Sequence, residues 1–447
     1  MPDAPEARST TPQGPDVDAT GPDTKTAAPA FPEDYVVGQE IEVTVDKVAH
    51  GGHFVARHND LVVFVRHALP GEDVTARVTE ISAHYLRADA IRIHSAHPSR
   101  VTPNCPAFHP GGCGGCDFAH ANQDLQRDLK LQVLRESLHR QGKLSIDRVE
   151  ELTRMGIRDL GNHEGWRTRM RYRTMRRDSD VVLALRAHRS DQLVDASSCV
   201  IADPTGHAYA REFAHSSPEG GDVLMAVDSG GPVVEFIAQN SRDRARRQVR
   251  HTIEVDDQEW EFRTRIDGFW QVHPRLAQTL VQTVLAWADP KPGEKWWDLY
   301  AGVGPIAAAL ATRVGGSGHV VAVEGSSFAV REAQRNLGRR FVGDELSVVR
   351  ADVRRWIAND ALSEPDPDGV VMDPPRSGAG RPVLQGVAAR QPRRLIVVAC
   401  DPVALGRDTA ILAEFGYRLE RVTAWDAFPH THHLETVALF LPADQIS

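Results

Sequence analysis

The five cysteines of this 447-residue chain divide into a group of four and a single residue. Cys105, Cys113 and Cys116 lie close together in the chain, and Cys199 follows far downstream. Four thiolates can hold one tetrahedral zinc ion or one cubane cluster, and the spacing leaves both open. Cys400 stands alone after the apolar run Leu-Ile-Val-Val-Ala, which predicts a buried strand. A thiol at a strand end is either an inert core residue or a nucleophile.

Glycines and carboxylates follow three apolar runs in the C-terminal half. The run that ends at Leu299 leads into a turn with Gly302 and Gly304, where the backbone can approach a ligand closely. Glu324 ends the next run, where a carboxylate can accept hydrogen bonds from ribose hydroxyls, and Asp352 follows the third run, near the expected adenine amine. A dinucleotide fingerprint would need a third glycine. The order resembles the S-adenosylmethionine site of Rossmann-like methyltransferases, with an unrelated nucleotide-binding α/β domain as the alternative.

Two further motifs carry groups that could react. Asp373 ends an apolar run and is followed by two prolines, which restrain its backbone at the carboxyl edge of the predicted sheet. Near the C-terminus, Phe-Pro-His-Thr-His-His-Leu-Glu ends at Glu435 and leads into a last strand. The histidines 430, 432 and 433 have the composition of a metal cluster, and Glu435 could also be a surface acid at a strand start.

The elements that position these residues are predicted from periodicity and turn signals. Short alternating strands separated by Gly and Pro turns predict a small β-barrel, and apolar side chains along one stripe predict a helix over 123–141. Strands alternating with helices near the C-terminus predict a parallel sheet. The expected units are a disordered tail over 1–34, an OB-like barrel over 35–96, a central α+β domain over 97–118 and 151–264, a helical segment over 119–150, and a Rossmann-like domain over 265–447.

Composition excludes some classes and leaves nucleic acid open. No apolar run approaches the ~20 residues that span a bilayer, and the N-terminus lacks a signal-peptide pattern, so we expect a cytosolic protein. The net charge of the chain is −9. Much of this negative charge lies in residues 1–34, which contain seven acidic and two basic residues. A local basic face can still bind RNA. Alternation over 166–173 predicts that one strand face carries four arginines for phosphate contacts or for solvation: Arg167, Arg169, Arg171 and Arg173.

Five sequence words occur in the order of the RNA uracil-C5 methyltransferase family, which the chain resembles over residues ~36–447. They are Phe-Trp-Gln-Val, Asp-Leu-Tyr-Ala-Gly-Val-Gly, Asp-Pro-Pro-Arg, Cys-Asp-Pro-Val-Ala-Leu-Gly-Arg-Asp and the Phe-Pro-His motif. Gly-Gly-His-Phe-Val-Ala and Leu-Pro-Gly-Glu-Asp-Val resemble a TRAM barrel, and barrels of this shape often bind single-stranded nucleic acid. The subgroup resembled is RumA-like, with a TRAM domain and a [4Fe-4S] cluster.

The resemblance implies roles for single residues. Cys400 matches the nucleophile, Glu435 the base, and Asp373 the residue that hydrogen-bonds the uracil edge. Cofactor contacts are implied for six residues: Gln271, Tyr300, Gly302, Glu324, Asp352 and Asp373. The cluster ligands implied are Cys105, Cys113, Cys116 and Cys199, and the helix after Cys116 is expected to pack on the catalytic domain. The chain departs from the family pattern at Ala301, Pro305 and His273, and by a longer Cys105–Cys113 spacing.

The implied function is S-adenosylmethionine-dependent methylation of C5 of a uridine in RNA. The thiolate adds to C6, C5 takes the methyl group, and a base removes the C5 proton. Ribosomal RNA is the expected substrate and a monomer the expected state, with transfer RNA as the alternative. A methyltransferase of small molecules and a non-catalytic RNA-binding protein are the rival classes.

Overall fold

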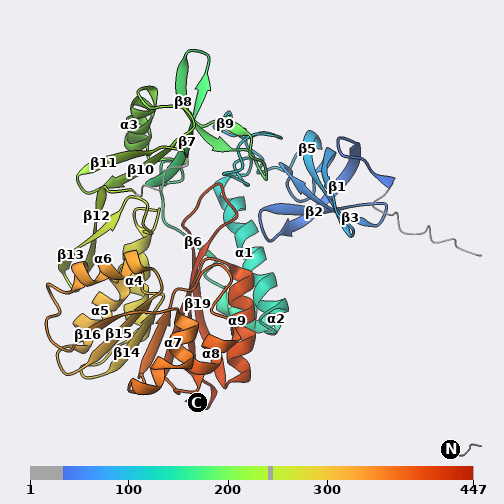
Figure 1. Cartoon of the computed structure of the whole chain (residues 1–447). Helices are drawn as coiled ribbons and strands as arrows, with labels where there is room; N and C mark the ends of the chain where they lie inside the picture. The colour runs from blue at the N-terminus through green and yellow to red at the C-terminus, as the bar shows by residue number, and fades with distance from the viewer. Residues whose placement is uncertain (1–33, 240–244, 446–447) are drawn as a thin grey trace, which may run out of the picture.

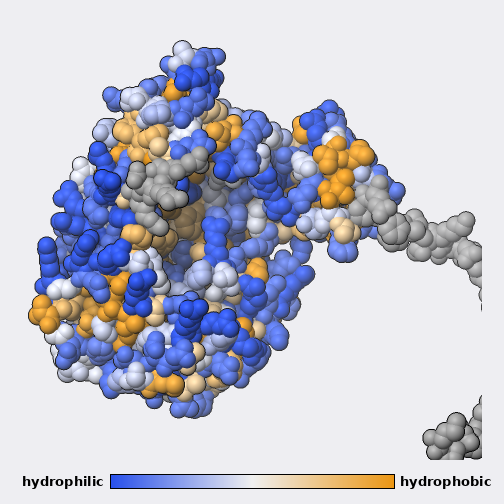
Figure 2. All heavy atoms as spheres, viewed as in Figure 1, coloured by the Kyte–Doolittle hydropathy of each residue, from blue (hydrophilic) through white to orange (hydrophobic). Residues whose placement is uncertain are grey.

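The computed structural model describes residues 34–239 and 245–445. The predicted disordered tail therefore lies outside the described residues, apart from Asp34. The chain forms a barrel, a small central sheet and a large catalytic sheet, which Figure 1 shows in blue, green and yellow to red. Figure 2 shows hydrophilic side chains over most of one face. No helix in the described part of the chain is long and apolar enough to cross a membrane.

The N-terminal strands close into a five-stranded barrel, as the sequence predicts. Its hydrogen-bonded order is β1-β2-β3-β5-β4. Alternate side chains fill the interior, and Phe54, Val63 and Val65 are fully buried there. Gly51 and Gly52 both have positive φ and form the turn between the first two strands. The strands are β1 (Glu40–Ala49), β2 (His53–His58), β3 (Leu61–Arg66), β4 (Asp73–Ile81) and β5 (Tyr85–Ser95).

Helix α1 (Gln123–Arg140) joins the barrel to the catalytic domain. Asn122 caps it by accepting from the Leu125 N–H. Leu129 packs in the barrel core, whereas Leu134 and Leu138 pack in the catalytic core. The predicted single apolar stripe is therefore wrong, because the leucines are shared between two cores. Figure 1 shows α1 beside α9 (Pro402–Glu414) and α2 (Ile146–Leu152).

The central sheet has the order β11-β10-β7-β8-β9 and packs against α3 (Pro204–His215). Tyr172, Leu183 and Met225 are buried between the sheet and the helix. A separate hairpin, β12-β13, leads toward the catalytic domain. The strands are β7 (Arg169–Arg177), β8 (Asp180–Arg186), β9 (Leu193–Asp195), β10 (Asp222–Asp228), β11 (Gly231–Ile237), β12 (Gln248–Val255) and β13 (Gln258–Arg265).

The arginines of β7 are not a free phosphate-binding row. Arg169 is buried and donates to the carbonyl oxygens of Arg265, Ile266 and Gly268. Arg171 and Arg173 both bind the carboxylate of Asp222. The alternation of faces was predicted correctly, but the predicted row of four arginines available for phosphate is wrong. Asp222 lies on the neighbouring strand and some fifty residues away, so the local sequence does not show the pairing.

The catalytic sheet has the order β16-β15-β14-β17-β18-β20-β19-β6, with β20 antiparallel to its neighbours. Helices cover both faces, as predicted for a Rossmann-like fold. β6 (Ile157–Asp159) belongs to this sheet, although its residues fall within the range 151–264 predicted for the central domain. The other strands are β14 (Lys295–Leu299), β15 (His319–Glu324), β16 (Leu346–Arg350), β17 (Gly369–Met372), β18 (Arg394–Ala399), β19 (Tyr417–Asp426) and β20 (Glu435–Pro442).

The two faces of this sheet bury separate apolar cores. One core contains α4 (Leu276–Ala288), α5 (Pro305–Val314) and α6 (Ser327–Leu337). The other contains α7 (Val353–Ala358), α8 (Arg381–Ala388) and α9, together with part of α1 and α2. Strands buried on both sides read as continuous apolar runs, which is why the sequence indicated them clearly.

Candidate active site

Strand register brings the lone thiol and the candidate base together. Ala399 of β18 is paired with Thr436 of β20, and the Thr436 hydroxyl donates to the Ala399 carbonyl at 2.6 Å. Cys400 and Glu435 are the next residues outward, so they lie side by side at this edge, and Glu435 still pairs with β19. Asp373 follows β17, which runs parallel to β18. The structure thus places all three at one carboxyl edge of the sheet.

The charges at this edge raise one another's pKa values. Burial raises the pKa of the Cys400 thiol to about 11, and the nearby carboxyls of Glu435 and Asp373 add to this, whereas Arg376 opposes it. Burial and Asp373 raise the pKa of Glu435 well above its usual range. Burial raises the pKa of Asp373 to about 7. In the free site these shifts favour the protonated forms of Cys400 and Glu435, and Asp373 changes its charge near neutral pH.

The segment before Glu435 is held from outside the catalytic sheet. The buried Lys130 of α1 pairs with Asp426 at 2.5 Å and donates to the Phe428 carbonyl at 3.1 Å. Gln126, also of α1, accepts from the His430 N–H at 2.7 Å. The three histidines of this segment are not arranged as a metal site: within 34–239 and 245–445 no group of three or more His, Cys, Asp or Glu side chains is placed to hold a metal ion.

The predicted cofactor residues gather at the ends of β14, β15 and β16. One Glu324 oxygen accepts from the Gly302 N–H at 3.0 Å. The space beside Gly302 is open, since a Cβ there would meet no atom within 4 Å. Tyr300 has a φ of +65°, a strained conformation that is common at functional sites. Burial, and then Asp352, raises the pKa of Tyr300 to about 12, which places these two side chains close together.

Two of the predicted cofactor residues have other contacts. Asp352 caps α7 by accepting from the Arg355 N–H at 3.0 Å, so one of its oxygens already has a structural partner. Gln271 is half-buried in the loop between β13 and α4. This loop is held by the Val272 carbonyl, which accepts from both the N–H and the hydroxyl of Thr168. The contact of Gln271 with a cofactor stays a prediction.

Asp298 is a site residue that the sequence analysis missed. It is fully buried in β14, and its Oδ2 has no hydrogen-bond partner. Burial, and then the neighbouring Asp373 and Glu324, raise its pKa to about 8. A cluster of carboxyls of this kind suits a ligand with positive charge, as S-adenosylmethionine has at its sulfonium and amine. An acid inside the otherwise apolar run Trp-Trp-Asp-Leu was the signal that could have revealed it.

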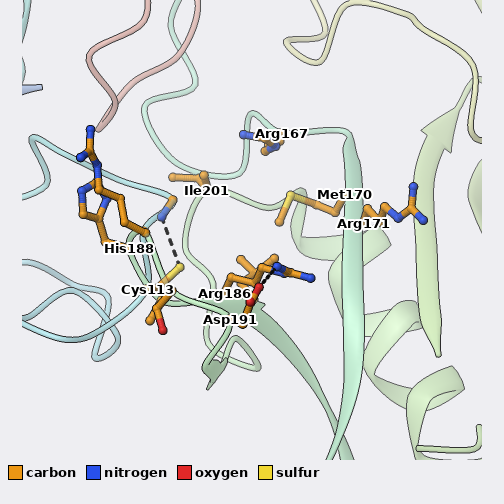
Figure 3. A pocket seen from close by; sticks show the side chains of 14 residues that line it. Cys113, Arg167, Met170, Arg171, Arg186, His188, Asp191 and Ile201 are labelled. Atoms are coloured by element: carbon orange, nitrogen blue, oxygen red, sulfur yellow. Dashed lines mark hydrogen bonds and ion pairs between the residues drawn. The ribbon is translucent and has the colours of Figure 1, made fainter. Parts of the chain in front are cut away.

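The four other cysteines lie near one another: three are in the turns between β5 and α1, and Cys199 is in the turn between β9 and α3. All are half-buried and free. Burial raises the pKa of Cys116, and the three other thiols raise it further. The N–H of Gly115 donates to the sulfur of Cys113 at 3.4 Å. Figure 3 shows Cys113 on the wall of a cavity of about 660 Å³, with Arg186 and its partner Asp191 beside it.

The four thiols match the donor type of a cluster. Like the histidines, however, they are not placed together as metal ligands, since among the residues that the structure describes no group of three or more His, Cys, Asp or Glu side chains is positioned to hold a metal ion. Four thiols influence one another electrostatically, and Cys199 accepts from the N–H groups of Ile201 and Ala202. Arg167 lies close to Cys116 and Cys199, where a cation favours thiolates. Backbone N–H donors and a cation are what charged sulfurs need in a partly buried position.

Comparison with known proteins identifies the family. Residues 36–91 match the TRAM domain, and residues 234–442 match the tRNA (Uracil-5-)-methyltransferase family. A 23S rRNA (uracil(1939)-C(5))-methyltransferase, RlmD, of Methylococcus capsulatus is 30% identical over 90% of this chain and 97% of its own length. The chain belongs to the RNA uracil-C5 methyltransferase family. It is an S-adenosylmethionine-dependent RNA methyltransferase with a TRAM barrel.

Other relatives agree with this membership. An RNA methyltransferase of Streptomyces coelicolor is 36% identical over 91% of this chain and 94% of its own length. The crystal structure of the tRNA (uracil-54, C5)-methyltransferase of Pyrococcus abyssi, in complex with S-adenosyl-L-homocysteine, has a TM-score of 0.65. It covers 90% of this chain and 100% of its own, at 20% identity, and so shows that the folds are alike.

In this member of the RNA uracil-C5 methyltransferase family, the barrel reaches the turn that carries Cys400. His50, in the turn between β1 and β2, lies 2.8 Å from Asp401, the residue after Cys400. His50, Gly51 and Cys400 line one small cavity of about 10 Å³, enough for about one water molecule. His50 has no counterpart in the sequence predictions, because its partner is 351 residues away.

Proposed function

We propose that the protein methylates C5 of a uridine in RNA through a covalent bond between Cys400 and C6 of the base. The observation that carries this proposal is the position of Cys400 beside the buried Glu435, one residue beyond the Ala399–Thr436 pair that joins β18 and β20. Cys400 first gives up its thiol proton to water. The thiolate then adds to C6, which breaks the C5–C6 double bond and gives C5 the electron density of an enolate. S-adenosylmethionine supplies the methyl group that C5 takes.

Glu435 then completes the reaction. In its ionised form it removes the proton from C5 and becomes the carboxylic acid, the C5–C6 double bond returns, and the bond from C6 to the Cys400 sulfur breaks. The sulfur leaves with the electron pair that it brought. A carboxyl group with a raised pKa is well suited to hold that proton in a closed site, and the raised pKa of Glu435 supports this role. Asp373, at the same edge, is placed to hydrogen-bond the uracil.

The RNA substrate we propose is ribosomal RNA. The relatives that carry a substrate in their names include several 23S rRNA enzymes matched over nearly the whole chain, as the Methylococcus capsulatus protein is. The substrate must present an unstacked uridine, because C5 and C6 are inaccessible in a paired helix. Arg167 lines the cavity beside Cys113 and offers a contact for the flanking strand. The other arginines of this cavity, Arg171, Arg186 and Arg189, are already paired with carboxylates. Ribosomal RNA also implies a cytoplasmic location.

We propose further that Cys105, Cys113, Cys116 and Cys199 hold a [4Fe-4S] cluster. The N–H groups that face Cys113 and Cys199, and the nearby Arg167, support charged sulfurs in this position. Such a cluster would supply no step of methyl transfer, which needs no electron. The four cysteines would therefore shape the RNA-facing turns.

Trapping with 5-fluorouridine RNA tests the reaction. Fluorine at C5 cannot be removed as a proton, so a stable complex of enzyme and RNA should form in the presence of S-adenosylmethionine. A transcript of the cognate rRNA domain and a transfer RNA transcript, each with 5-fluorouridine, should be compared by denaturing gel. A complex with the rRNA transcript alone is expected. Its absence with both would contradict the reaction, and a complex with transfer RNA alone would contradict the proposed substrate.

A further inference from the structure

We infer that Asp117 is a positioning residue that links the cysteine turns to the base Glu435. This inference rests on the proposed function. Asp117 directly follows Cys116 in the chain, yet its contacts are with the segment that ends at Glu435. Nothing in the sequence motifs connects these two parts, since more than 300 residues separate them.

Three hydrogen bonds and one short ring contact make the link. The N–H groups of Asp117 and Phe118 both donate to the carbonyl oxygen of His430 at 2.8 Å. Oδ2 of Asp117 accepts from the N–H of His432 at 3.1 Å and lies 2.6 Å from Nδ1 of its ring. Two consecutive residues of one turn thus hold the other segment at two points.

The held segment is one that needs support. His430 has a φ of +68°, a conformation that a histidine adopts only when its surroundings impose it. His432 lies three residues before Glu435, and its ring centroid is 4.0 Å from that of His433, with the two rings tilted by 47°. A base must lie within a fraction of an ångström of its working position, and a displacement of about 1 Å can cost about 100-fold in rate.

The barrel fixes Asp117 from the opposite side. A Cβ placed on Gly52 would lie only 2.6 Å from Cγ of Asp117, so the barrel turn packs directly on this carboxylate. Arg66 of β3 lies 4.0 Å from Oδ1 and donates to the carbonyl of Cys116 at 3.4 Å. Asp117 therefore contacts the barrel, the cysteine turn and the segment that ends at Glu435. A displacement of any of these three parts should move His432.

The consequence is specific to one step. Addition of Cys400 and methylation of C5 come before proton removal, and only proton removal uses Glu435. A displaced Glu435 should therefore leave the RNA attached through C6 to Cys400, with both a methyl group and the proton still on C5. Loss of general folding or of RNA binding would instead lower every step together.

The test measures the covalent complex and the free product separately, with ordinary uridine RNA in single turnover. Asp117→Ala should form the complex at the wild-type rate within about threefold and release product roughly 10- to 100-fold more slowly, so the complex accumulates. Asp117→Asn keeps an acceptor oxygen and should lie between the two. The matched control is Asp124→Ala, which removes an exposed carboxylate near the start of α1 and should behave as wild type.

Two further variants make the outcome decisive. His432→Asn removes the ring contact from the catalytic side and leaves the cysteine turn intact, so it should give the same accumulation. Equal loss of complex and product in both variants, or wild-type behaviour in both, would overturn the role of Asp117. Glu435→Gln reports on the proposed function itself: if it accumulates no complex, the reaction is wrong, and if it alone accumulates complex, only the link through Asp117 is wrong.

Discussion

The catalytic edge around Cys400 and the turns around Cys116 both contain half-buried thiols, but the neighbours of these thiols differ in kind. Besides burial, the carboxyls of Glu435 and Asp373 raise the pKa of Cys400. Besides burial, other thiols raise the pKa of Cys116. The N–H groups of Ile201 and Ala202 lower the pKa of Cys199, which burial raises.

This difference is what the proposed roles require, in which Cys400 reacts with the base and the four other thiols bind a cluster. A thiol among acids stays protonated until a substrate and a positive charge arrive, which protects it between turnovers. Thiols near N–H donors and near Arg167 have partners for lasting negative charge, as a bound metal centre requires. Replacing one cysteine of each group should therefore have opposite effects on methylation and on iron content.

The largest expected effect comes from replacing one thiol of each group. Cys400→Ser should lower methylation by roughly 10⁴-fold or more, because the hydroxyl cannot add to C6, yet the purified protein should keep its iron. Cys113→Ser should lose iron and still form the covalent complex with 5-fluorouridine RNA. Activity assays with iron analysis of anaerobically purified protein measure both. Loss of iron in Cys400→Ser, or of the covalent complex in Cys113→Ser, would break the distinction.

Two arginines of β7 differ in how much they should contribute to stability. Arg169 joins the central domain to residues 265–268 through three carbonyl contacts, whereas Arg171 is an exposed partner of Asp222. Arg169→Ala leaves buried carbonyls unpaired and should lower the free energy of unfolding by about 3–5 kcal/mol. The matched variant Arg171→Ala should cost less than about 1 kcal/mol, because Asp222 keeps Arg173. Urea unfolding measures both, and equal losses would contradict the structural role of Arg169.

Much of the catalytic edge could be predicted from the sequence because its signals are local. Buried parallel strands are continuous apolar runs, and the residue at the end of each run lies at the same edge of the sheet. Cys400, Asp373 and Glu324 were placed in this way. The barrel and the Rossmann-like fold were predicted correctly for the same reason, since turns and periodicity repeat along short stretches.

The contacts that join the domains could not be predicted from local signals. Gln126 and Lys130 are polar residues on a helix, and the pattern predicts that such residues face solvent. Both are fully buried, because their partners lie about 300 residues away in the segment before Glu435. Asp117 and His50 were missed for the same reason. One polar residue in a periodic pattern carries no information about a partner that folding brings from far along the chain.

A smaller effect concerns the reactivity of Cys400 in the free enzyme. With a pKa of about 11, its thiolate fraction should grow about tenfold for each pH unit between 7 and 9, a rise of about 100-fold over that range. Alkylation by iodoacetamide, followed by mass spectrometry of the Cys400 peptide, measures this rise. Glu435→Gln removes a neighbouring carboxyl and should speed alkylation at a given pH. An alkylation rate that stops rising below pH 9 would show that the Cys400 thiol is already ionised. The proposed difference between Cys400 and the four other cysteines would then be wrong.

The raised pKa of Asp298, at the cofactor side of the catalytic edge, should make the stability of the protein depend on pH. Burial raises the pKa of Asp298 to about 8, above the value in an unfolded chain. The folded protein therefore holds this proton more tightly than the unfolded chain does. The stability this contributes is complete below the unfolded pKa and is lost as pH rises toward 8, by about 1.4 kcal/mol per pH unit within that window.

A cationic ligand should reverse this preference, because it favours the ionised carboxylate. Binding of S-adenosylmethionine to the wild type should release a proton near neutral pH, and its affinity should rise as pH rises toward 8. Asp298→Asn should release fewer protons, and at pH 8 it should bind the cofactor roughly tenfold more weakly. Calorimetry in two buffers of different ionisation enthalpy measures the protons released, with the exposed Asp180→Asn as the matched control. Unchanged proton release in Asp298→Asn would show that its unpaired oxygen does not face the charge of the cofactor.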